Sequence, residues 1–97
     1  MKEFRGERTI DGIRVTVDGD LLDPQIHVKQ FTDLGFEWTY EGDSPRQLAL
    51  AILVNHFDDE ERALALCEPF MKSVIAQLDN EWQLTSAEID KAVSNIG

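Results

Sequence analysis

A run of seven apolar residues, Leu48 to Val54, limits the folds open to this chain more than any other feature. It follows Ser44-Pro45-Arg46-Gln47, in which Ser44 can cap a helix, Pro45 suits the first helical position and Gln47 can bond back to the cap. A helix that is apolar on nearly every side must be buried on nearly every side. The sequence therefore predicts a central core helix from about Pro45 to Phe57.

The residues just before this helix alternate in character. One face would carry the aromatic side chains Phe36, Trp38 and Tyr40, and the other would carry Glu37, Thr39 and Glu41. A period of two is typical of a half-buried strand. We expect this aromatic strand to lead directly into the core helix.

The N-terminal residues 2–17 have the pattern of a β-hairpin. Asp11-Gly12 is a strong turn signal, and Ile13, Val15 and Val17 alternate with polar residues after it. Gly6 weakens the first strand and is expected to mark a bulge. Asp18-Gly19-Asp20 indicates a second turn. In residues 25–34, Ile26, Val28 and Phe31 could form a further short strand.

Two more helices are expected in the second half. The acidic residues Asp58 to Glu61 suit a helix start, and apolar residues then recur every four positions as far as Leu78. Pro69 predicts a kink or a break near Cys67 to Glu68, and Asp79-Asn80 the helix end.

The last segments complete the expected architecture. Glu81 to Leu84 could form a short edge strand or an extended loop, and Thr85 with Glu88 predicts a capping box for a final helix. The fold class is therefore α+β: a small antiparallel sheet of three or four strands packed against three helices, as a single domain over residues 1–97. We expect its core to contain Leu50, Leu53, Phe70, Val74 and Trp82.

The charge of the chain is strongly negative and unevenly distributed. Nineteen acids and nine bases give a net charge of −10 over 97 residues. Residues 1–17 hold four bases and three acids, whereas residues 18–97 hold five bases and sixteen acids. Such a chain repels nucleic acid and anionic membranes and is steered toward basic surfaces. Direct binding of nucleic acid is therefore not expected.

Residues for catalysis or metal binding do not form a recognisable set. His27 and His56 have no cysteine at zinc spacing, and the single Cys67 lies in an apolar run that favours burial. His56 stands near the end of the core helix, where a cation is favoured. No phosphate loop or nucleophile elbow occurs. We expect a protein that is not an enzyme and has no cofactor or metal.

The sequence also shows no membrane-spanning segment and no signal peptide. No apolar run approaches the roughly 20 residues that span a bilayer. The N-terminal residues show no hydrophobic signal region. A cytoplasmic protein without membrane contact is expected.

The surviving candidates for function are carboxylates in three groups. We expect a partner-binding surface built from Asp18, Asp20 and Asp23, from Glu37, Glu41 and Asp43, and from Asp58, Asp59, Glu60 and Glu61. If two groups came together, they would mimic the charge of DNA and compete for a basic groove. The alternative is an acidic face that serves only solubility.

Three stretches also carry a resemblance to a known family. Arg5 to Gly12, GFEWTYEGDSPRQLALAIL at 35–53 and Trp82 to Thr85 resemble a family of small uncharacterised prokaryotic domains, which usually have a small residue in place of Asp43. The resemblance covers nearly the whole chain and implies an origin on plasmids, prophages and other mobile elements. It assigns no chemistry to any residue.

Size, charge and that resemblance together suggest two functions. In size and charge, the chain is similar to the phage anti-CRISPR inhibitors, which implies an inhibitor of a host nucleic-acid-handling complex, with a CRISPR effector as the suspected partner. The alternative is an accessory or self-associating domain of a plasmid or prophage without an inhibitory role. Either a monomer or a homodimer is compatible with the sequence.

Overall fold

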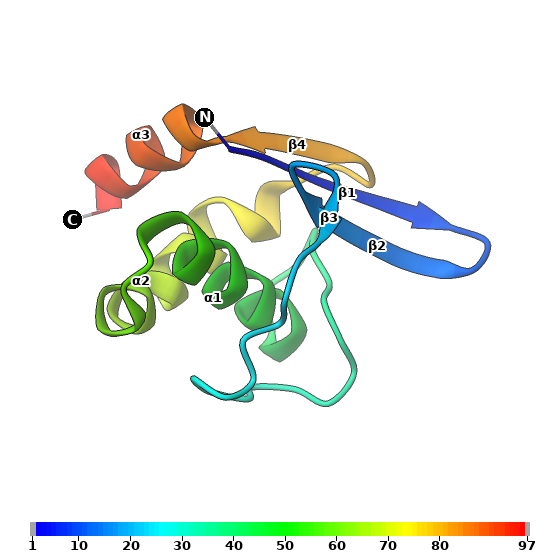
Figure 1. Cartoon of the computed structure of the whole chain (residues 1–97), viewed down its shortest axis with the longest axis horizontal. Coiled ribbons are helices and arrows are strands. Elements are labelled where there is room, and N and C mark those ends of the chain that lie inside the picture. Colours follow the sequence, from blue (N-terminus) through cyan, green and yellow to red (C-terminus); the bar gives the residue numbers. More distant parts are fainter. Residues whose placement is uncertain (1, 97) are drawn as a thin grey trace.

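One antiparallel sheet and three helices make up the structure, a computed structural model that describes residues 2–96. The strands are β1 (Glu3–Thr9), β2 (Gly12–Val17), β3 (Asp20–Leu21) and β4 (Trp82–Thr85). The helices are α1 (Asp43–Phe57), α2 (Glu60–Ser73) and α3 (Ser86–Ile96), with a short 3-10 turn, η1 (Ile75–Gln77), after α2. Helices α1 and α2 lie on one side of the sheet, and α3 continues from the end of β4 (Figure 1). The predicted α+β class is confirmed.

The sheet has the order β3-β2-β1-β4. The predicted N-terminal hairpin is confirmed, and its turn end extends beyond the helices (Figure 1). Gly6 stands opposite both Val15 and Trp82 in a continuous register, so the bulge expected at Gly6 is absent. The second turn is confirmed, because β3 pairs with the end of β2. Strand β4 takes the edge beside β1, as one of the two predictions for that segment required.

The predicted aromatic strand is wrong. Residues 22–42 contain no strand and form a long loop beside α1 (Figure 1). Trp38 is fully buried, whereas Tyr40 is 50% exposed. Thr39 between them has a φ of 80°, which a β-branched residue rarely adopts, and its N–H donates to Ile75 O at 3.2 Å. The alternating pattern correctly identified Trp38 as a core residue. A strand that pairs with the sheet also requires a continuous extended backbone, which this segment lacks. The short strand considered within residues 25–34 is absent for the same reason.

Helix α1 is the predicted core helix with a different start. Residues 48–53 are all completely buried, which confirms its central place. The helix begins at Asp43. Its N-cap residue is Gly42, which has no side chain that could cap the helix. The predicted cap at Ser44 is therefore wrong. Ser44 is buried and its Oγ lies 3.1 Å from Thr32 Oγ1, because the long loop covers this end of the helix.

Helix α2 starts where the acidic residues predicted. Asp59 is its N-cap and accepts a hydrogen bond from Arg62 N at 3.1 Å. A kink or a break was expected near Pro69, and the break is absent, because α2 continues through this residue to Ser73. Pro69 deprives the carbonyl of Ala65 of its usual donor, and Ala65 is exposed, so water can replace that donor. The helix ends before Leu78, where η1 replaces the continuous helix that the apolar spacing suggested.

The last helix and the core follow the sequence closely. Glu88 N donates to Thr85 Oγ1 at 3.2 Å and Thr85 N donates to Glu88 Oε1 at 3.0 Å, so the capping box is confirmed. Within the described residues, no helix has the length and apolar character needed to cross a membrane. The predicted core residues Leu50, Leu53, Phe70 and Trp82 are buried in one cluster, and Val74 is partly buried against it.

Candidate partner-binding surface

The ten candidate carboxylates come from three parts of the fold: the turn and loop around β3, the long loop with the start of α1, and the α1–α2 junction. The contacts of each group decide how much of its charge is paired within the chain.

The group around the expected aromatic strand is largely neutralised. Glu37 lies in the long loop and pairs with Arg8 at 2.8 Å. Asp43 lies in the first turn of α1 and pairs with Arg46 at 2.5 Å. The outer strand face on which Glu37 and Glu41 were expected does not exist, because this segment is irregular. Among the described residues only Glu41 of this group has no such partner.

The group near the second turn serves local structure. Asp18 Oδ1 accepts a hydrogen bond from Glu3 N at 2.9 Å and holds the turn against β1. Asp23 Oδ1 accepts one from Gln25 N at 2.8 Å, an arrangement typical of an Asx turn. Asp20 is exposed, and its side chain has no hydrogen bond or ion pair in the described part of the chain.

The four acids at the α1–α2 junction form the most concentrated group. All four are exposed. Asp59 caps α2, and Glu60 Oε2 lies 3.6 Å from His27 Nε2 of the long loop. The side chains of Asp58 and Glu61 have no hydrogen bond or ion pair to any residue from 2 to 96. Of the ten candidates, these two, Asp20 and Glu41 are the carboxylates without a hydrogen bond or ion pair within residues 2–96.

Gln47 is a positioning residue whose role the sequence did not reveal. It is 1% exposed and its amide holds the long loop against α1. Nε2 donates to Pro24 O at 2.7 Å and to Lys29 O at 3.0 Å, and Oε1 accepts from Phe31 N at 2.7 Å. The sequence assigned it to a capping box instead. Its place one residue before a fully apolar run was the available signal, since a buried amide requires partners.

A cationic residue on the hairpin fixes the other end of the loop. Arg8 lies on the side of β1 that faces the helices, and its guanidinium stands 4.5 Å from the ring centroid of Trp38. The same side chain pairs with Glu37. Arg8 was not a candidate from the sequence, because its partners come from a segment thirty residues away.

The long loop also exposes apolar side chains. Leu34 is 85% exposed, Ile26 53% and Tyr40 50%. Loops of this length without regular structure are uncommon and are frequently functional. The surface of the long loop is thus mixed, because it exposes these apolar side chains as well as acids such as Glu41.

The residues with potential reactivity are held in structural roles. Cys67 is buried as predicted, and burial raises the pKa of its thiol although Arg46 opposes this. His56 lies in the last turn of α1 as expected, and its Nε2 is 2.7 Å from Asp90 Oδ1, so it links α1 to α3. Between residues 2 and 96 no group of three His, Cys, Asp or Glu residues is arranged to hold a metal ion.

Comparison with known proteins places the chain in a family. The model of a family of unknown function (DUF6166) matches residues 4–95, and the chain belongs to this family. No curated protein and no solved structure matches the chain.

Proposed function

We propose that this member of the family is a non-enzymatic acidic protein that binds a basic surface of a nucleic-acid-handling protein complex. The observation that carries the proposal is the set of exposed carboxylates without a partner among residues 2–96, Asp58 and Glu61 foremost, on a chain of net charge −10. Binding to a cationic partner would give these charges the counter-charges that the fold does not supply.

The physical argument rests on electrostatic steering. Charges already paired inside the molecule attract a partner weakly, because an arginine beside each carboxylate offsets part of its charge: Arg8 for Glu37, and Arg46 for both Asp43 and Glu68. Unpaired exposed carboxylates keep their field, which accelerates encounters with basic surfaces and weakens as salt is added. The α1–α2 junction is therefore proposed as the main contact, and the acids paired with Arg8 and Arg46 contribute less.

A finer proposal concerns the biological role. A groove that binds nucleic acid is lined by lysine and arginine, and a protein carboxylate can occupy the position of a phosphate. The protein would then inhibit a host complex by occluding that groove, as phage anti-CRISPR proteins do, with a CRISPR effector as the suspected partner. This role is supported by the charge and by the resemblance to domains from mobile elements.

The test compares two charge reversals of equal size. Asp58→Lys with Glu61→Lys removes the unpaired acids at the junction. The matched control, Asp33→Lys with Asp79→Lys, changes the net charge equally at exposed residues elsewhere. Tagged proteins are used to recover partners from a host lysate, with elution along a salt gradient and competition by DNA.

We expect the wild type and the control to recover the same nucleic-acid-binding complex, released by moderate salt and by DNA. The junction variant should recover none, although its circular dichroism stays native. Equal recovery by both variants would exclude the junction as the contact. Recovery of no basic partner by folded wild-type protein would contradict the proposed function itself.

A further inference from the structure

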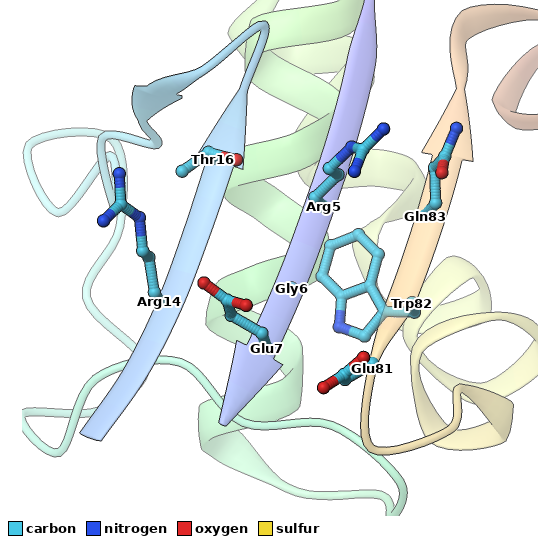
Figure 2. A pocket seen from close by; sticks show the side chains of 8 residues that line it. All are labelled: Arg5, Gly6, Glu7, Arg14, Thr16, Glu81, Trp82 and Gln83. Carbon is cyan, nitrogen blue, oxygen red and sulfur yellow. The ribbon is translucent and has the colours of Figure 1, made fainter. Parts of the chain in front are cut away.

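The face of the sheet that points away from the helices is uncovered. It carries the side chains of alternate strand residues, among them Glu3, Arg5, Glu7, Arg14 and Gln83, and we call it the outer sheet face. Figure 2 views this face with a helix behind the strands. A depression of about 420 Å³ lies on this face, and Gly6 and Trp82 are among the residues that line it.

The outer sheet face differs in charge from the rest of the molecule. Its four charged strand residues are Glu3, Arg5, Glu7 and Arg14, and their charges sum to zero. With Glu81 at the rim of the depression the area carries a net charge of −1, so nearly all of the net charge of −10 resides elsewhere. Two copies of the chain repel one another through most of their surfaces, and this face is a broad surface nearly free of that repulsion.

The charges on this face are also incompletely paired. Arg5 pairs with Glu3 at 2.7 Å. Arg14 stands directly opposite Glu7 in the register of β1 and β2, yet no ion pair joins them. Among the described residues Arg14 has no carboxylate partner, and neither Glu7 nor Glu81 at the rim of the depression has a cationic one. A cation and two anions are thus left unpaired within one small area.

We propose that the outer sheet face binds a second copy of this chain, face to face about a two-fold axis. A two-fold contact is self-complementary, so Arg14 of each copy can meet Glu7 of the other, and the pairing missing within one chain is made twice between two. The ion pairs between the two copies join exposed side chains, which contribute little each, so we expect a weak dimer with a dissociation constant on the order of micromolar. This inference goes beyond the proposed function, because the acids of the α1–α2 junction stay free in the dimer.

The test uses sedimentation velocity of the full chain over a concentration series. Arg14→Glu gives each face three acids and one base, and it should raise the dimer dissociation constant by about tenfold or more. Glu7→Arg should do the same by placing arginines against arginines. The double variant Glu7→Arg with Arg14→Glu exchanges the two charges, and it should restore the wild-type dimer. Lys91→Glu on α3 is the control that changes the net charge as much as Arg14→Glu does.

A mixing experiment separates contact pairing from general charge effects. The Arg14→Glu and Glu7→Arg proteins should associate with each other more strongly than either does with itself, since their faces then have opposite charge. The association is measured at low and at high salt, because salt screens both the Arg14–Glu7 pairs and the repulsion between two chains of net charge −10.

Two results would overturn the inference. One is a wild-type protein that stays monomeric up to about 0.5 mM, far above the expected micromolar range, at low and high salt. The other is a dimer whose dissociation constant is the same in the Arg14→Glu protein as in Lys91→Glu. Circular dichroism and urea unfolding of every variant establish that each one is folded, because like charges across β1 and β2 also cost some stability.

Discussion

The indole of Trp82 occupies the space that a side chain at Gly6 would need. The two residues are paired across β1 and β4, and the ring lies beside Gly6 between the strands (Figure 2). Trp82 also meets Trp38 edge to face, with ring centroids 5.8 Å apart. A glycine in the middle of a strand costs backbone entropy, and here the cost is offset by the burial of a large aromatic side chain.

Gly6→Ala should destabilise the protein by about 1–3 kcal/mol, because a methyl group at this position would overlap the indole. Urea denaturation measures the loss. Trp82→Phe is the partner variant: it removes the crowded part of the ring and a buried Nε1 that has no hydrogen-bond acceptor in the described structure. The double variant should lose less free energy of unfolding than the two single variants together. Strict additivity would show that a methyl group at residue 6 does not clash with the indole.

Gln47→Leu should release the long loop while α1 stays folded. The apolar residue leaves Phe31 N–H, Pro24 O and Lys29 O without their partner, and each unsatisfied buried group costs about 1–3 kcal/mol. We expect faster amide hydrogen exchange at Phe31, and Gln47→Glu should have at least as large an effect at neutral pH, because it buries a carboxylate against the carbonyl oxygens of Pro24 and Lys29. Unchanged exchange at Phe31 in the leucine variant would mean that the loop is held by other contacts.

Leu50→Ala should lower the free energy of unfolding by about 2–5 kcal/mol, the usual cost of a cavity at a fully buried leucine. Leu64→Ala on α2 is the matched control, because Leu64 is 37% exposed and leaves no enclosed cavity. Chemical denaturation of both proteins gives the comparison. Equal losses in the two variants would show that α1 is less central to the core than its burial indicates.

Glu68 should contribute to the acid sensitivity of the fold. Arg46 Nε donates to Glu68 Oε2 at 2.7 Å and its second guanidinium nitrogen donates to Oε1 at 3.0 Å. These hydrogen bonds lower the pKa of the Glu68 carboxyl in the folded protein. Its stabilising contribution is therefore present above the ordinary pKa of an unfolded glutamate and is lost as the pH falls through the lowered folded value.

The check is a series of unfolding curves between neutral pH and acid. Glu68→Gln should lose less stability on acidification than the wild type does, since the titrating group is gone. Glu61→Gln is the comparison on the same helix, at a glutamate without an arginine partner. If Glu68→Gln and the wild type lose stability in parallel over the whole series, the Arg46 contact does not affect folding.

Local signals explain most of what could be predicted. Asp11-Gly12 dictates a tight turn between two extended segments, and Thr85 with Glu88 forms a capping box within four residues. The apolar run of α1 identifies a buried helix because no other arrangement hides so many consecutive side chains. In each case the interacting groups are neighbours in the sequence, so the pattern contains its own physical cause.

The errors occurred where the partners are distant. Phe36, Trp38 and Tyr40 alternate like a strand, but the edge of β1 is taken by β4, and the backbone at Thr39 turns into a left-handed conformation. Gln47 resembled a capping residue, yet its amide is consumed by three backbone groups of the long loop. A pattern of a few neighbouring residues does not show that a distant segment takes the partners expected for them.

Composition and contacts between near neighbours were enough to predict the fold class, the hairpin, the core helix and the excess of negative charge. The folded structure was needed to tell which of the candidate carboxylates are paired. Arg8 and Arg46 pair with Glu37 and Asp43 through contacts that folding alone creates, and Asp58 and Glu61 have no counter-charge among residues 2–96. The attraction that a carboxylate exerts on a partner depends on the charges within a few ångströms of it. Those distances are set only when the chain folds.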